Sequence, residues 1–115
     1  MIKLIVAVRR NPDMSVEEFR DHWKERHAKL VSENPATARY VSKYVQCHTM
    51  PEEYENGDVA FDGTAELWFD SRGDMDAFYS DPDYLAHIRP DEALFADLER
   101  TVFFVTQEEP VLDET

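Results

Sequence analysis

The sequence predicts an α+β protein of the ferredoxin-like type, in which two helices cover one face of a four-stranded antiparallel sheet. Two observations predict this fold. Four separate runs of β-branched and aromatic residues have the pattern of strands, and two segments between them repeat apolar residues every three or four positions, as helices do. The elements follow one another as β-α-β-β-α-β. The length of 115 residues suits one domain with a single core.

The first strand is expected over 2–8, where aliphatic residues predominate, and Asn11-Pro12-Asp13 breaks it. Ser15 and Glu18 then have the spacing of a capping box, which predicts the start of a helix. One face of this helix carries a row of apolar side chains and one histidine at spacings of three or four: Val16, Phe19, Trp23, His27, Leu30 and Val31. Asn34-Pro35 ends the helix.

The second and third strands are expected over 38–49 and 61–69, separated by the acidic, turn-like segment 51–58. Alternation along the second strand places five side chains on one of its faces: Tyr40, Ser42, Tyr44, Gln46 and His48. In the third strand, Glu66 and Trp68 share one face, and the other face carries Gly63, Ala65, Leu67 and Phe69.

Ser71, with Asp74 three residues later, suits the start of the second helix, whose inward residues are Met75, Phe78 and Tyr79. Asp81-Pro82-Asp83 interrupts this helix. A short turn over 84–88, another helix over 91–98 and a last strand over 101–106 complete the fold. The predicted domain therefore spans 1–110, and 111–115 is predicted to be an acidic tail.

The charge balance excludes several classes of partner. Twelve Lys and Arg against 25 Asp and Glu give a formal net charge of −13, which repels nucleic acid and anionic membranes. No run approaches the roughly 20 apolar residues of a membrane helix, and the first residues lack the layout of a secretory signal. A single cysteine, Cys47, provides neither an internal disulfide nor a thiolate zinc site. We expect a cytoplasmic protein.

The second face of the sheet is the basis for predicting an oligomer. Two helices cover only one face of four strands, so the other face should carry Trp68 or its neighbours, which are costly to leave in water. Burying roughly 800 Å² per partner at about 25 cal/mol per Å² would favour association strongly. The sequence therefore predicts a homodimer formed face to face through the open sheet face.

Three motifs spread over the chain resemble EthD-like proteins. The helix 19–30 resembles their F-x-x-x-W-x-x-x-H-x-x-L motif, 62–69 their D-G-x-x-E-L-W-F strand, and 95–100 their closing F-x-D-x-x-R segment. The resemblance implies a dimeric α+β barrel, in agreement with the element order. The wider relatives of these proteins include cofactor-independent monooxygenases, polyketide cyclases, a muconolactone isomerase and fungal polyketide decarboxylases or dehydratases.

His27 is the first candidate for a catalytic residue. Helical spacing places its imidazole beside Phe19 and Trp23, near the end of the first helix. An ordinary histidine titrates near pH 6.5, which suits proton transfer at neutral pH. The alternative is a core histidine satisfied by one backbone carbonyl. Because His27 matches the histidine of the EthD-like helix motif, we favour a pocket residue.

The second strand supplies two further candidates. Tyr40 or His48 could hold a carbonyl group or act as a second base, with Tyr44 as an aromatic wall. At roughly 3.3 Å per residue, Tyr40 and His48 lie about 26 Å apart, so a small ligand reaches only one of them. Substrate-binding residues are predicted from the helix and both strands: Phe19, Trp23, Tyr44, Glu66 and Trp68. The alternative is that this strand face belongs to a dimer core.

Other reactive side chains are expected to be structural. Cys47 points away from His48 and is predicted to be a small core residue, and His22 is predicted to be solvated on the polar side of its helix. Glu66, which is also among the predicted substrate-binding residues, needs an ion-pair partner if it is buried, and Arg39 and Arg100 are the candidates. The four histidines lack metal-binding spacings, and no nucleotide or flavin motif is present, so we predict no metal and no bound cofactor.

These features favour a small cofactor-independent enzyme that transfers protons by acid/base catalysis. Its ligand would be an aromatic, polyketide-like or lactone intermediate, and the reaction a cyclisation, isomerisation or dehydration with His27 as the acid or base. Two alternatives stay open: a cofactor-free monooxygenase, and a non-catalytic binding or accessory module of a degradation or biosynthesis pathway.

Overall fold

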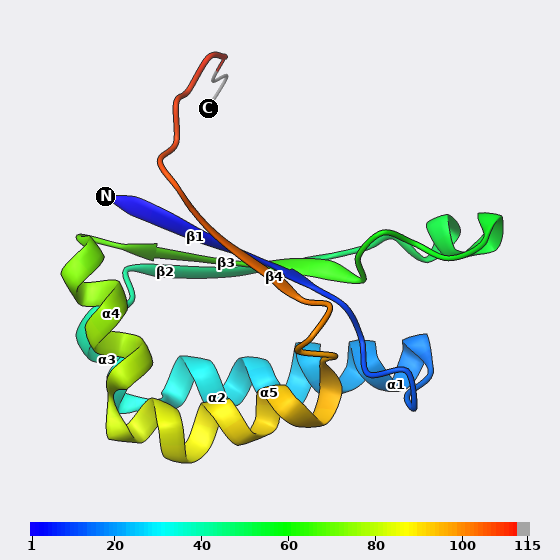
Figure 1. The fold of residues 1–115 in the computed structure, drawn as a ribbon, viewed down its shortest axis with the longest axis horizontal. Helices are drawn as coiled ribbons and strands as arrows, with labels where there is room; N and C mark the ends of the chain where they lie inside the picture. Colours follow the sequence, from blue (N-terminus) through cyan, green and yellow to red (C-terminus); the bar gives the residue numbers. More distant parts are fainter. Residues whose placement is uncertain (113–115) are drawn as a thin grey trace.

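The structure is a computed structural model that describes residues 1–112. Four strands form one antiparallel sheet in the order β2-β3-β1-β4: β1 (Ile2–Val8), β2 (Lys43–His48), β3 (Gly63–Phe69) and β4 (Val102–Thr106). The α-helices lie against one face of this sheet and leave the other face open (Figure 1). The predicted ferredoxin-like α+β fold is confirmed. Residues 113–115, part of the predicted acidic tail, lie outside the described residues.

The first helical arm is continuous from Val16 to Glu33, but it is not α-helical throughout. It consists of α1 (Val16–Asp21), the π-helical segment η1 (His22–His27) and α2 (Ala28–Glu33). The predicted capping box is confirmed: Glu18 N–H donates to the Ser15 hydroxyl (3.0 Å), and Ser15 N–H donates to the Glu18 carboxylate (2.9 Å). The sequence spacing did not predict the wider π turn, which changes the direction of the side chains after Asp21.

The expected strand 38–49 is wrong over its first half. Asn34 ends α2 and at once caps a new helix, α3 (Pro35–Tyr40), by accepting a hydrogen bond from Ala36 N–H at 2.8 Å. Proline at the first helical position favours this second start because its missing N–H is not needed there. Tyr40 therefore belongs to a helix, and β2 begins only at Lys43.

The second helical arm consists of α4 (Arg72–Ser80), the π-helical segment η3 (Tyr84–Ile88) and α5 (Arg89–Phe95). Ser71 caps α4 as predicted, accepting from Asp74 N–H at 3.1 Å. The expected turn over 84–88 is instead helical and runs directly into α5. Within residues 1–112, no helix has both the length and the apolar character needed to cross a bilayer.

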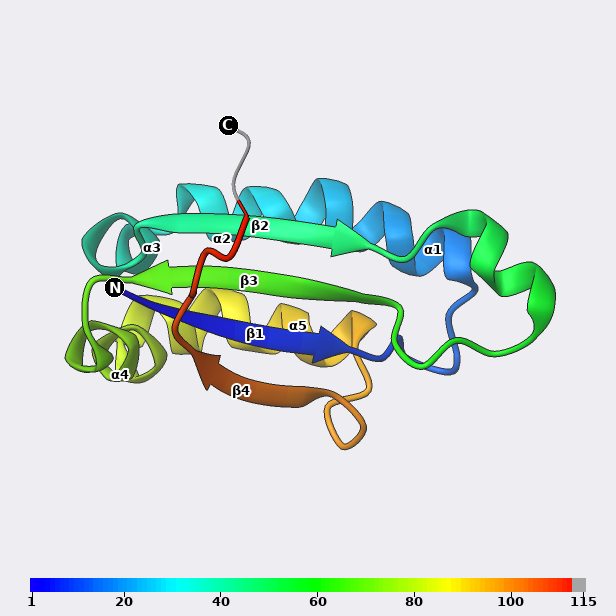
Figure 2. The ribbon, with the colours of Figure 1, turned by 90° about the horizontal axis from the view of Figure 1, so that it is seen from above.

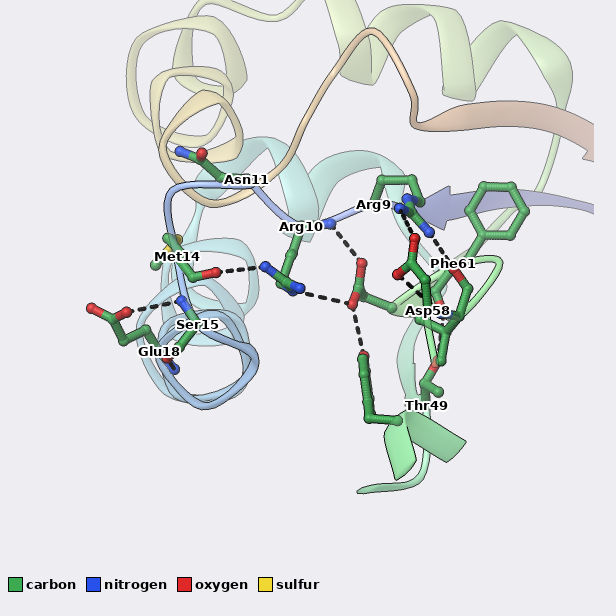
Figure 3. A network of polar contacts seen from close by, with 12 residues as sticks. Arg9, Arg10, Asn11, Met14, Ser15, Glu18, Thr49, Asp58 and Phe61 are labelled. Carbon is green, nitrogen blue, oxygen red and sulfur yellow. Dashed lines mark hydrogen bonds and ion pairs between the residues drawn. The ribbon is translucent and has the colours of Figure 1, made fainter. Parts of the chain in front are cut away.

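A long connection between β2 and β3 projects from one end of the sheet (Figure 2) and contains a 3-10 helix, η2 (Pro51–Asn56), that ends at Gly57 with φ +112°. Buried Asp62 holds this connection to the end of β1, accepting from Arg10 N–H at 2.8 Å and from the Tyr54 hydroxyl at 2.7 Å. Arg9 donates to the carbonyl of Ala60 at 2.9 Å, and its guanidinium pairs with Asp58 (Figure 3).

The strand register determines which side chains face the helices. Leu4, Val6 and Val8 of β1 pair with Leu67, Ala65 and Gly63 of β3, and these residues point to the helical side. At Gly63, a Cβ atom would strike the carbonyl oxygen of Cys47 and lie 2.6 Å from the indole of Trp23. Glycine therefore allows Trp23 to pack directly on the sheet, beside the site described below.

The open face of the sheet carries Trp68, as predicted, but this side chain is only 9% exposed. Lys3 and Lys43 place their ammonium groups 4.7 Å from its ring centroid. The indole N–H donates to the Glu108 carboxylate at 2.6 Å, because the C-terminal segment crosses this face of the sheet (Figure 2). Cation–π contacts and one charged acceptor thus shield Trp68 within a single chain.

Candidate active site

A cavity of about 50 Å³ lies between the sheet and the two helical arms. Both π-helical segments contribute to its wall: Trp23 and His27 from η1, and Tyr84 and Ile88 from η3. The remaining wall is largely apolar and comes from the strands, α4 and α5: Val6, Val8, Ala65, Leu67, Phe78 and Phe95. Leu98 and Phe103 also line the cavity and are exposed, which places its mouth where α5 leads into β4.

His27 lies in this wall with a carboxylate behind it. The residue is 4% exposed, and its Nδ1 lies 2.8 Å from Oδ2 of Asp91 in α5. A carboxylate accepts hydrogen bonds, so this contact places the proton of the neutral ring on Nδ1. Nε2 forms no hydrogen bond with any residue in 1–112 and keeps its lone pair. The partner of His27 is therefore Asp91 rather than a backbone carbonyl.

His22 approaches the same carboxylate. Its Nε2 lies 2.9 Å and 3.0 Å from the two oxygens of Asp91, so the prediction of a solvated His22 is wrong. In a regular α-helix, residues five apart point about 140° away from each other. The π turn over η1 closes that angle and directs His22 and His27 to one acceptor.

Burial determines the charge state of His27. Removal from water lowers its pKa below the ordinary value near 6.5, and the carboxylate of Asp91 opposes this shift only in part. His27 is therefore neutral at pH 7. A neutral imidazole with an unpaired Nε2 beside a cavity is the arrangement of a general base.

Glu92, the next residue of α5, lines the cavity itself. Its Oε1 accepts a hydrogen bond from the Tyr84 hydroxyl at 2.8 Å. Burial in this apolar region raises the pKa of Glu92 from 4.5 to about 7. The sequence interpretation missed both Asp91 and Glu92, because it assigned the acidic residues to a solvated surface.

Replacing Glu92 by glutamine should stabilise the protein at alkaline pH. A raised pKa means that folding favours the protonated carboxyl, so this stabilisation is complete below pH 4.5 and is lost as the pH rises through about 7. The glutamine variant does not titrate and loses nothing. The difference between its unfolding free energy and that of the wild type should therefore grow by up to about 3 kcal/mol between pH 4.5 and pH 8. Urea unfolding of both proteins across this pH range measures the difference in unfolding free energy. A difference that does not change with pH would contradict the prediction.

Three predicted site residues line the cavity: Trp23, His27 and Tyr44. Tyr44 lies on the helical side of β2, where burial raises its pKa to about 12. Gln46 Nε2 donates to the Tyr44 oxygen at 2.8 Å, which leaves the hydroxyl hydrogen free for another acceptor. Phe19 lies outside the cavity, 5.4 Å from Trp23 between ring centroids.

His48 is close to the site without lining it. Its ring stacks on Trp23 at 4.5 Å between centroids, and its Nε2 lies 2.9 Å from Oε1 of Gln46. Tyr40 does not line the cavity, because it belongs to α3 and packs there against the core. The prediction that Tyr40, Tyr44 and His48 share one strand face is therefore wrong for Tyr40.

Glu66 and Trp68 lie on the open face, across the sheet from the cavity. Glu66 forms an ion pair as expected, but its partner is Lys3 at 2.6 Å, neither Arg39 nor Arg100. Cys47 is exposed on the same open face and donates to Glu66 at 3.4 Å, so the prediction of a core cysteine is wrong. These residues do not join His27. In the described part of the chain, no three His, Cys, Asp or Glu side chains are arranged to hold a metal ion.

The fold and the cavity define a ferredoxin-like α+β protein with a buried His–Asp pair between its sheet and its helices. The EthD domain model matches residues 11–99, and the chain belongs to the EthD domain family. Among curated proteins, it is similar to the dehydratase aurZ of Gibberella zeae, with 29% identity over 114 residues, which covers 91% of this chain and 75% of that protein.

Solved structures share the fold. An EthD family protein of Bacillus halodurans superimposes with a TM-score of 0.68 at 19% identity, covering 95% of this chain and 99% of the other. A dimeric protein of unknown function with a ferredoxin-like fold, from Bacteroides fragilis, gives a TM-score of 0.69 at 17% identity, covering 93% of this chain and 95% of the other. At these identities the likeness describes the fold alone.

Proposed function

We propose that this protein is a cofactor-independent enzyme that removes water from a small β-hydroxy carbonyl compound of aromatic or polyketide-like character. The observation that carries the proposal is the His27–Asp91 pair, 2.8 Å apart, with the free Nε2 of His27 beside an apolar cavity. The sequence similarity to a protein named as a dehydratase supports this choice among proton-transfer reactions.

In the proposed reaction, Nε2 of His27 removes a proton from the carbon next to the substrate carbonyl. Asp91 holds the imidazole by its Nδ1–H and stabilises the imidazolium that forms. The free hydroxyl hydrogen of Tyr44 donates to the carbonyl oxygen, where negative charge develops. The β-hydroxyl group leaves as water once a second group of the site has given it a proton, and a conjugated double bond forms.

The cavity determines which part of a substrate is buried. Its volume of about 50 Å³ accommodates the reacting atoms but not an aromatic ring as well. The ring would lie in the mouth between Leu98 and Phe103, where apolar side chains are exposed. The ligand is thus expected to enter with its carbonyl group first and to leave its bulk at the α5–β4 connection.

A direct test is to incubate the purified protein with 4-hydroxy-4-phenylbutan-2-one and follow the conjugated ketone by its absorbance. The reaction should proceed without added cofactor, in the presence of a chelator and without oxygen. In deuterated water, recovered substrate should carry deuterium next to the carbonyl, because His27 exchanges its proton with solvent. Neither product nor exchange at stoichiometric enzyme would contradict the proposal and favour a binding module. Oxygen consumption with substrate would favour a monooxygenase.

We also propose that the protein is a homodimer that pairs through the open sheet face. Four consecutive residues of the edge strand β4, Val102 to Val105, are between 41% and 52% exposed. The register directs Val102 and Phe104 to the open face, next to Ala7 and Ile5 of β1. Such an apolar strip is costly in water, and the similar Bacteroides protein is described as dimeric.

Sedimentation at micromolar concentration should therefore give the mass of a dimer. Phe104→Glu should convert it to a monomer, because a carboxylate cannot be buried unpaired in the interface. Leu94→Glu is the matched control, since Leu94 is also apolar and exposed but lies on the helical side of the molecule. A monomeric wild-type protein would contradict the prediction, as would equal loss of the dimer in both variants.

A further inference from the structure

Two neighbouring carboxyl groups of α5 point to different partners. Successive helix residues point about 100° apart. Asp91 therefore faces the two histidines of η1, whereas Glu92 faces the cavity and the hydroxyl of Tyr84. The proposed function uses Asp91 and leaves Glu92 without a role. A carboxyl group in an apolar cavity is costly to keep, so its presence there requires an explanation.

The hydrogen bonding of Glu92 leaves one of its oxygens available. Tyr84 donates to Oε1 at 2.8 Å, and Oε2 forms no hydrogen bond with any residue in 1–112. A proton on Oε2 would therefore be free to move to another acceptor. Burial favours the protonated form and raises the pKa of Glu92 to about 7, so near neutral pH a large fraction of the molecules holds this proton.

Loss of a hydroxyl group creates a need for such a proton. Hydroxide leaves carbon poorly near neutral pH, and protonation of the departing oxygen removes this obstacle. His27, which is neutral and accepts a proton, cannot supply it at the same moment. A dehydrating site therefore needs a second group that is neutral and donates, facing the same cavity as the base.

We propose that Glu92 is the general acid of this site and donates its Oε2 proton to the departing hydroxyl oxygen while His27 removes the proton next to the carbonyl. The inference rests on the proposed function and extends it. One C–H bond and one C–O bond break, a C=C bond forms, and water leaves. His27 ends with one proton more and Glu92 with one less, and transfer of that proton through solvent restores both groups.

His27 as base and Glu92 as acid together predict a pH profile of the rate with an acid limb and an alkaline limb. The acid limb reports His27, which must be neutral, and the alkaline limb reports Glu92, which must be protonated and titrates at about 7. Titratable and charged groups near Glu92 come from every surrounding element: Tyr44 of β2, His27 of η1, Tyr79 of α4, Tyr84 of η3, and Arg89 and Asp91 of α5. The three tyrosines stay neutral throughout this pH range, because burial raises the pKa of each.

The experiment compares two substrates that differ only in whether the leaving group needs a proton: 4-hydroxy-4-phenylbutan-2-one and its 4-acetoxy analogue, which loses acetate. For the hydroxy compound, Glu92→Gln should lower kcat by about 10²- to 10⁴-fold and remove the alkaline limb. For the acetoxy compound, kcat should stay within about threefold of wild type, because acetate leaves as a stable anion. Glutamine still accepts from Tyr84, so the local packing is kept.

Glu99→Gln, which changes an exposed glutamate that follows α5, is the matched control and should change the rate on neither substrate. Equal losses on both substrates in Glu92→Gln would overturn the inference, since a structural defect does not distinguish leaving groups. An unchanged rate on the hydroxy compound would overturn it as well. If the wild type eliminates acetate but not hydroxide, the base function stands and the acid role fails. If it eliminates neither, the proposed function and the inference fail together.

Discussion

Replacing His27 by asparagine should lower kcat for dehydration of the hydroxy ketone by about 10²- to 10⁴-fold, the usual contribution of a general base. Asparagine is chosen because its side-chain amide can take the place of Nδ1 and donate to Asp91. The buried carboxylate therefore keeps a partner, while the proton-accepting Nε2 is absent. KM should change little, since the wall formed by Trp23 and Tyr44 remains.

The measurement is a steady-state comparison with His87→Asn, which removes an exposed histidine of the second π-helical segment. Circular dichroism and thermal unfolding establish that both variants fold. Activity close to wild type in His27→Asn would remove this residue from the mechanism. Equal losses in both variants would show that the assay responds to something other than the cavity.

The second large effect is expected from Asp91→Asn. An amide can satisfy either tautomer of His27, so it no longer fixes the proton on Nδ1, and it carries no charge to stabilise the imidazolium. The expected loss in kcat is again about 10²- to 10⁴-fold. The carboxylate of Asp91 raises the pKa of His27 against the effect of burial, so its removal lowers that pKa further.

The pH profile separates this role from simple structural damage. In Asp91→Asn, the acid limb of kcat/KM should move to lower pH while the plateau falls, because the base stays neutral in more acidic solution. Asp76→Asn, at the exposed surface of α4, is the control and should leave the profile in place. An acid limb that stays where it is, or moves to higher pH, would contradict the coupling between Asp91 and His27.

Much of the fold could be predicted because its signals are local. The Ser15–Glu18 capping box, the aliphatic run of β1 and the alternation in β3 each reflect one element and its burial. The error at Tyr40 has a local cause as well. Asn34-Pro35 has the pattern of a helix end, although the same two residues also form a favourable start for the next helix.

The site was harder to predict because its partners come from distant segments. His27 was identified from its apolar helix face, but Asp91 is 64 residues away. A signal for the carboxylates was present: Asp91 and Glu92 are three and four residues after Ile88, and four and three before Phe95, both of which are buried. Acidic residues between two core positions of one helix are candidates for buried groups.

His22 and His27, which both contact Asp91, are five positions apart, a spacing that a regular α-helix would place on different sides. The π-helical segment η1 brings them to the same side. The geometry of the site therefore depends on the π turn, which accommodates one surplus residue in the first helical arm. A chain shortened by one position between His22 and His27 would recover uniform backbone pairing there. Such a deletion would leave the two histidines four positions apart, a spacing that an unbroken α-helix places on one side, so the two imidazoles would still meet at one carboxylate.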